Sequence, residues 1–129
     1  MPTMSDKIEH YKAGLKLFGA DKYTEAIAEY QLALAIEPDW EDGLHALAMA
    51  YMSAGKFDDA ITTGKRILEL NPNDPFVHTS LSMFYQRKGM IDEAEEESAK
   101  ARMASWKQEL KTNPDAPPPG PAGSLDVLQ

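Results

Sequence analysis

Apolar residues recur every three or four positions along most of this chain, which is the spacing of amphipathic helices. Gly or Pro separates the apolar runs at nearly regular intervals. The pattern predicts six helices, with starts near Ser5-Asp6, Thr24, Asp39, Asp58, Asp74 and Asp92 and breaks at Gly19, Pro38, Gly55, Pro72 and Gly89. The sixth helix meets neither Gly nor Pro before Pro114, so we expect it to reach about twenty residues.

A short motif occurs three times, and its closing alanines lie 34 residues apart. The copies are Ala20–Ala26, Ala54–Ala60 and Lys88–Ala94. A repeat of this length is one structural unit that cannot bury its apolar face alone. The units must therefore stack, and stacked units form an extended surface that is suited to binding.

These patterns predict one all-α domain over residues 6–111, an α-solenoid of three antiparallel helix–turn–helix hairpins with an extended last helix. The hairpins should span about 7–40, 41–74 and 75–111, after a flexible N-terminus at residues 1–5. Residues 112–129 are rich in Pro and predict a disordered tail. Two roles stay open for the tail: a passive extension, or a peptide arm ending in Leu125-Asp126-Val127-Leu128 that docks on a surface.

The net charge of −8 and the absence of Cys argue against several classes of function. An acidic chain lacks the basic stripe of a general nucleic-acid binder, so we expect no nucleic-acid partner. Without Cys there is no disulfide, thiol catalysis or cysteine metal site, and a reducing, cytoplasmic location is the default expectation. No apolar run approaches the roughly 18–20 residues that a membrane span needs.

The polar residues do not form a recognisable catalytic or metal motif. His10, His45 and His78 fall in separate repeats. Neighbouring repeats lie on the order of 10 Å apart, which is too far for a shared zinc ion. The chain has no Gly-rich phosphate loop and no nucleophile with a base in a local motif. We therefore expect a protein that is not an enzyme and has no metal site or cofactor.

The repeated residues resemble the tetratricopeptide repeat family, whose unit is a 34-residue helix–turn–helix with small residues where the helices cross. The second repeat carries the pattern most fully, at Leu44, Leu47, Ala48, Tyr51, Gly55, Ala60 and Pro72. The resemblance spans about residues 6–106 and implies a right-handed superhelix whose first helices line a concave groove. Some residues depart from the family pattern: His10 and His78 replace a bulky apolar residue, and Gly64 and Ser98 replace an aromatic one.

The resemblance assigns the groove to one face of the first helix of each hairpin. The residues on that face are Ile8, Tyr11, Leu15, Phe18, Asp42, His45, Met49, Met52, Ser53, Phe76, Thr79, Met83, Gln86 and Arg87. The set is apolar for a surface, and its methionines adapt to different apolar shapes. These side chains either belong to the core or form a groove for an apolar helix or an extended peptide of a partner, and we favour the groove.

Family members that bind the C-terminal tails of Hsp70 and Hsp90 use Lys, Asn and Arg side chains around the terminal carboxylate. The matching positions here are Tyr11, Leu15, Ala46, Phe76 and Ser80. None of them is basic and none is an amide. The resemblance therefore does not extend to this kind of chaperone-tail binding.

The third repeat carries Trp106 where the other two end in Pro. Met103, Trp106 and Leu110 form a stripe at helical spacing on the last helix. Trp106 either packs back on the third hairpin, or the stripe is a second interface that pairs with another subunit.

We predict a non-catalytic adaptor, scaffold or assembly factor that holds an apolar segment of a partner protein. The alternative is a structural subunit of a larger complex or a homo-oligomer that associates through the last helix.

Overall fold

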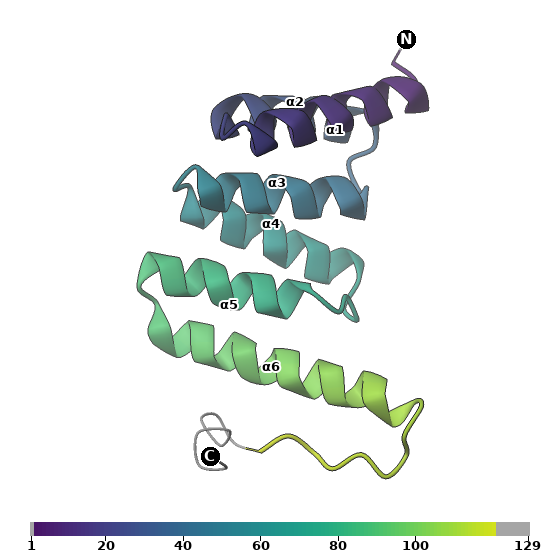
Figure 1. Cartoon of the computed structure of the whole chain (residues 1–129), viewed down its shortest axis with the longest axis vertical. Coiled ribbons are helices and arrows are strands. Elements are labelled where there is room, and N and C mark those ends of the chain that lie inside the picture. Colours follow the sequence, from purple (N-terminus) through teal and green to yellow (C-terminus); the bar gives the residue numbers. More distant parts are fainter. Residues whose placement is uncertain (1, 121–129) are drawn as a thin grey trace. The chain divides into compact units, whose positions relative to one another are not determined.

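The computed structural model describes residues 2–120, and within this range every regular element is an α-helix (Figure 1). The six helices are α1 (Met4–Gly19), α2 (Tyr23–Ile36), α3 (Glu41–Ser53), α4 (Phe57–Leu70), α5 (Val77–Lys88) and α6 (Ile91–Leu110). The prediction of an all-α protein built from helical hairpins is confirmed. The predicted helix starts differ from the observed ones by one to three residues.

The chain divides into two compact units, Met1–Pro72 and Asn73–Gln129. In the first unit α1 packs on α2, α3 packs on α4, and α2 packs on α3, so two hairpins are stacked. In the second unit α5 packs on α6. The expectation of one domain across all three hairpins stays a prediction.

The turn inside each hairpin is closed by the same backbone hydrogen bond. The bonds run from Lys22 N to Leu17 O, from Lys56 N to Tyr51 O and from Met90 N to Tyr85 O, at 2.9, 2.8 and 2.8 Å. This is the long bond of a Schellman motif, and it requires a left-handed residue just before the donor. Gly55 and Gly89 fill this position with φ of 79° and 89°, and Asp21 fills it in the first hairpin with φ of 61°.

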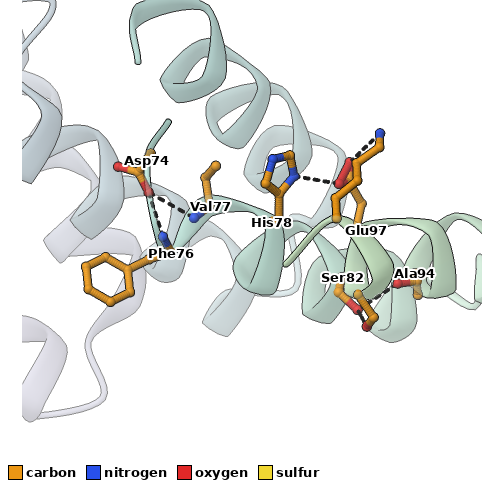
Figure 2. Close-up of polar contacts among 9 residues, drawn as sticks. Asp74, Phe76, Val77, His78, Ser82, Ala94 and Glu97 are labelled. Atoms are coloured by element: carbon orange, nitrogen blue, oxygen red, sulfur yellow. Dashed lines mark hydrogen bonds and ion pairs between the residues drawn. The ribbon is translucent and has the colours of Figure 1, made fainter. Parts of the chain in front are cut away.

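Two helix starts show why the pattern of capping residues is informative. Thr3 and Asp6 form a reciprocal capping box, and α1 therefore begins at Met4 instead of at the predicted Ser5-Asp6. Asp74 Oδ1 accepts hydrogen bonds from the backbone N–H groups of Phe76 and Val77, both at 2.9 Å, just ahead of α5 (Figure 2). The helix itself begins at Val77, three residues after the predicted start, and its N-cap residue is Phe76. The predicted cap of α3, Asp39, forms an ion pair with Arg66 instead, at 2.7 Å.

The two helices of a hairpin approach closely at one pair of positions. In the first hairpin Gly14 faces Tyr30, and a Cβ atom on Gly14 would overlap the Tyr30 ring. In the third hairpin the equivalent residues are Ser82 and Ser98, whose hydroxyl oxygens lie 2.7 Å apart. At this position of the third hairpin, a hydrogen bond between two hydroxyl groups thus stands where the first hairpin has a ring packed on a glycine.

The core of the first unit lies among α1, α2 and α3. Its buried residues are Ala26, Ile27, Tyr30, Leu47 and Ala50, and the partly buried residues packed against it are Tyr11, Leu17, Phe18, Leu34, Ala46, Tyr51 and Ala54. Tyr11 and Phe18, which were predicted to line the groove, thus also contribute to this core. Their rings contact Tyr30 and Tyr23, with centroids 5.9 and 5.3 Å apart.

The helix α6 is 20 residues long, as predicted, and the chain reverses direction after it. Asn113 N donates to Glu109 O at 2.8 Å, and Ala116 N donates to Asn113 O at 3.0 Å. The indole N–H of Trp106 donates to the carbonyl oxygen of Ala116 at 3.0 Å, and Ala116 is buried. These contacts concern only the start of the predicted tail, so a disordered tail over residues 112–129 stays a prediction; Leu125–Leu128 lie outside the described residues.

We predict that Gly55→Ala lowers the free energy of unfolding by about 1 kcal/mol, because a side chain disfavours the left-handed conformation. An added Cβ at this position would meet no atom within 4 Å. The loss of unfolding free energy would therefore come from the backbone conformation and not from a steric clash. Urea denaturation followed by circular dichroism measures it. Gly19→Ala is the matched control, since its Cβ also meets nothing and its φ is not positive; an equal loss in this control would contradict the interpretation.

Candidate protein-binding surface

Five apolar side chains follow one side of α1 at alternating spacings of four and three residues. This α1 stripe consists of Met4, Ile8, Tyr11, Leu15 and Phe18. Met4, Ile8 and Leu15 are exposed, whereas Tyr11 and Phe18 are half-buried because they also contact the core. The stripe contains all four residues that were predicted to line the groove in the first hairpin, and the earlier helix start adds Met4 to them.

A cluster of charged and aromatic side chains holds the start of α1 in place. The Nζ atom of Lys7, a residue only 8% exposed, lies 2.8 Å from Glu37 Oε1. The same atom lies 4.1 Å from the centre of the Trp40 ring, a cation–π contact. The Tyr11 ring meets Trp40 edge-on, with centroids 4.9 Å apart. Sequence reasoning missed this cluster, because no local pattern links Lys7 to residues thirty positions away.

The residues of α3 at the equivalent positions are less exposed than those of α1. Asp42, His45, Met49 and Met52 stand 34 residues after Ile8, Tyr11, Leu15 and Phe18. Asp42 is exposed, and the other three are half-buried, as is Ser53. The helices α1 and α3 are in contact within the first unit. A groove shared by their predicted residues stays a prediction.

The predicted groove residues of the third hairpin belong to the second unit. Phe76 precedes α5, is 67% exposed, and points away from His78 and Glu97 (Figure 2). Thr79, Gln86 and Arg87 are exposed, and Met83 is half-buried. A groove that runs over all three hairpins stays a prediction.

The predicted second interface on α6 is partly used within the chain. Trp106 is half-buried, and its indole N–H is bonded to Ala116 O. Leu110 is half-buried and Met103 is exposed. The side chain that was most suited to anchor another subunit is therefore engaged by the residues that follow the helix.

Two histidines that depart from the family pattern pair with glutamates on the second helix of their own hairpin. His10 Nδ1 lies 2.8 Å from Glu29 Oε2, and His78 Nδ1 lies 2.9 Å from Glu97 Oε2 (Figure 2). His78 stands two repeat lengths after His10, and Glu97 stands two repeat lengths after Glu29. The repeat period was the signal that could have revealed these partners. The second hairpin has no such pair, and it carries buried Leu44 and Thr63 at the same positions.

The two histidine–glutamate pairs differ in burial, and this difference determines how much each pair contributes to stability. The side chains of His10 and Glu29 are 36% and 29% exposed, against 17% and 10% for His78 and Glu97. The free-energy cost of a polar group without a hydrogen-bond partner rises as the group becomes more deeply buried. The pair in the third hairpin should therefore matter more for stability than the pair in the first.

Two tyrosines of the first unit are held in the neutral form. Burial, and to a smaller extent the neighbouring Tyr11, raise the pKa of Tyr30 above its ordinary value of 10.0. The hydrogen bond from the Tyr23 hydroxyl to Asp21 Oδ1, at 2.9 Å, raises the pKa of Tyr23. The Tyr30 ring thus acts as a packing group of the core, and the Tyr23 hydroxyl as a hydrogen-bond donor.

Within residues 2–120, no three His, Asp or Glu side chains come together in a way that could hold a metal ion. No helix in this part of the chain is both long enough and apolar enough to cross a membrane.

The stacked hairpins, the left-handed turn residue in each and the exposed first helices define a helical-repeat protein. The profile of the tetratricopeptide repeat family matches residues 17–84, and the chain belongs to this family.

Two relatives place this membership in context. The chain is 32% identical over 127 residues to the Photosystem I assembly protein Ycf3 of Synechococcus sp. (strain CC9605), a match that covers 92% of this chain and 69% of that protein. It superposes on a crystal structure of MamA with a TM-score of 0.75 and 26% identity, over 83% of this chain and 63% of the MamA chain. The chain thus spans less than two thirds of that MamA structure.

A third similarity concerns the fold alone. The second tetratricopeptide domain of Spaghetti (RPAP3), solved bound to an HSP90 peptide, superposes with a TM-score of 0.69 at 19% identity. The match covers 76% of this chain and 91% of that domain.

We predict that His78→Leu destabilises the second unit by about 1–3 kcal/mol, because it leaves the buried Glu97 carboxylate without its nearest partner. The double variant His78→Leu with Glu97→Thr copies the Leu44 and Thr63 pair of the second hairpin and should recover most of the loss. Thermal denaturation measures both. His10→Leu is the control for burial and should cost less; a double variant as unstable as the single one would contradict this explanation.

We also predict that Trp106→Phe, which keeps an aromatic ring but removes the N–H donor, loosens the segment around Ala116. The lost hydrogen bond is worth about 1 kcal/mol. Limited proteolysis should cleave this segment faster in the variant. Trp40→Phe, in the other unit, should leave the cleavage rate unchanged, and equal rates for the Trp106 variant and the unaltered chain would show that the bond does not hold the segment.

Proposed function

We propose that this chain is a non-catalytic adaptor or assembly factor that holds an apolar segment of a partner protein on the exposed face of its first helices. The observation that carries the proposal is the α1 stripe. Ile8 and Leu15 remain exposed although they stand on a helix whose other side packs on α2. A small repeat protein has little apolar surface to spare, so three exposed and two half-buried large apolar side chains along one side of α1 favour a binding role.

The family and its members support the same class of function. Tetratricopeptide repeats present stacked helices to other proteins, and fold alone does not name the partner. The Ycf3 relative is described as an assembly protein for photosystem I. For this chain we take over only the general role of assisting assembly by binding a protein, in the cytoplasmic compartment that the cysteine-free sequence suggests.

The alternative role as a subunit that associates through α6 has less support. Met103 is exposed, but Trp106 is bonded to the chain's own Ala116 and is not presented as an anchor. A homo-oligomer through this helix would first have to release that contact. We therefore place the partner on the first helices.

The experiment compares two leucines of nearly equal exposure, one on each helix of the first hairpin. Leu15 in the α1 stripe is 46% exposed, and Leu32 on α2 is 48% exposed. We expect Leu15→Glu to reduce the amount of co-purified partner about tenfold or more, because burying a leucine is worth about 1.5–3 kcal/mol. Quantitative mass spectrometry of affinity-purified protein measures this.

Leu32→Glu is the matched control and should leave partner recovery unchanged. Both variants should keep the helical circular dichroism spectrum, since both side chains are on the surface. Equal recovery with Leu15→Glu and with the unaltered chain would refute the proposal, and so would an equal loss with both variants.

A further inference from the structure

The spacing of the α1 stripe carries information about the shape of its partner. Met4, Ile8, Tyr11, Leu15 and Phe18 follow one another at intervals of 4, 3, 4 and 3 residues. These intervals are those of the a and d positions of a coiled coil, where the side chains of one helix insert between those of another. At about 1.5 Å per residue the stripe extends for about 21 Å, the length of two heptads.

An extended peptide would fit this surface poorly. Its backbone N–H and C=O groups need partners, and helices α1 and α3 have already used their own backbone groups within each helix. In the α1 stripe only Tyr11 carries a polar group, and neither the stripe nor the predicted α3 residues Asp42, His45, Met49, Met52 and Ser53 include an Asn or Gln side chain, which can donate to and accept from a peptide backbone at once. A partner helix satisfies its own backbone and needs from the surface only apolar contact, which the stripe supplies.

Charged residues border the stripe on two sides. Lys12 and Lys16 are exposed, and by the 100° turn per residue they lie beyond Ile8 on the side away from Tyr11. Tyr11 contacts Trp40, which precedes α3. The side of the stripe that faces α3 is therefore the side of Tyr11, opposite to the side that carries Lys12 and Lys16. On α3 the exposed Asp42 stands at the position equivalent to Ile8. The stripe thus runs between two lysines and one aspartate.

The stripe is also held in a defined position before any partner binds. Lys7 is bonded to Glu37 and lies over Trp40, and Tyr11 packs on the same ring. These contacts tie α1 to the connection between the first two hairpins. A surface that is ordered in advance loses less entropy on binding.

We propose that the first unit binds a single amphipathic helix of a partner protein, with heptad-spaced apolar residues, an acidic flank beside Lys12 and Lys16, and a basic flank beside Asp42. The inference rests on the proposed function and specifies the partner class for the same surface. The complementary charges determine the direction in which the helix lies, because reversing the helix exchanges its two flanks.

The test uses two synthetic three-heptad peptides of the same composition, with Leu at a and d, glutamate on one flank and lysine on the other. The second peptide has the flanks exchanged. Each carries a spin label at its N-terminus, and the full chain is observed by amide NMR. We expect the spin labels of the two peptides to broaden signals at opposite ends of α1, because the peptides lie in opposite directions along it. In the triple variant Lys12→Glu, Lys16→Glu, Asp42→Lys, each peptide should lie in the reverse direction, so that its label broadens signals at the other end of α1.

Two protein variants show that binding uses the α1 stripe. Leu15→Glu should weaken binding of both peptides about tenfold or more, whereas Leu32→Glu should not change it. Broadening at the same end with both peptides would overturn the assignment of the flanks. No binding of either peptide would overturn the inference as a whole.

Three further outcomes identify another occupant, and each would overturn the proposal. A peptide of the same composition with a proline in each heptad cannot form the helix, and equally tight binding of this peptide would indicate an extended ligand. A sedimenting dimer that Leu15→Glu dissociates would indicate a second copy of the chain. Peptide binding that is seen only after truncation at Gly120 would indicate the chain's own C-terminal segment.

These outcomes can be told apart from failure of the proposed function. If Leu15→Glu abolishes recovery of cellular partners but no helical peptide binds, the surface is a binding site and only the helical partner is wrong. If Leu15→Glu changes neither partner recovery nor peptide binding, both proposals fail.

Discussion

The close approach of the two helices in each hairpin is the constraint on which the rest of the structure depends. Gly14 leaves room for the Tyr30 ring, and in the third hairpin Ser82 and Ser98 meet through their hydroxyl groups. This contact sets the rotation of the first helix about its own axis. Because Gly14 faces α2, the neighbouring Leu15 is turned by about 100° and remains at the surface. The packing of the hairpin therefore creates the exposed stripe.

A second layer of contacts shows how one repeat pattern tolerates different chemistry. Two hairpins join their helices through a histidine and a glutamate, and the second does so through Leu44 and Thr63. The Thr63 hydroxyl donates to the carbonyl oxygen of Asp59 at 2.8 Å, so this polar group also has its partner. Each arrangement gives the polar side chains between the helices a hydrogen-bond partner, which is the condition for placing such groups there.

The two ends of the described chain have different surfaces. At the start, Lys7 and Trp40 order a helix whose apolar stripe stays exposed. At the end, the Trp106 side chain is bonded to the segment that follows α6. The chain thus covers an apolar side chain on its last helix with its own residues and leaves the first helix open. This asymmetry is the reason for placing the partner on the first helices.

The sequence by itself determined the six helices, the hairpin turns and the face of α1 that is apolar, because helical spacing, the 34-residue period and the turn glycines are local or repeated signals. It also predicted the length of α6. The division of the chain into two units, the partner of Lys7 and the binding of Trp106 to Ala116 were decided only by the tertiary structure. Such contacts depend on which side chains from distant positions arrive at the same place, and periodicity carries no information about that.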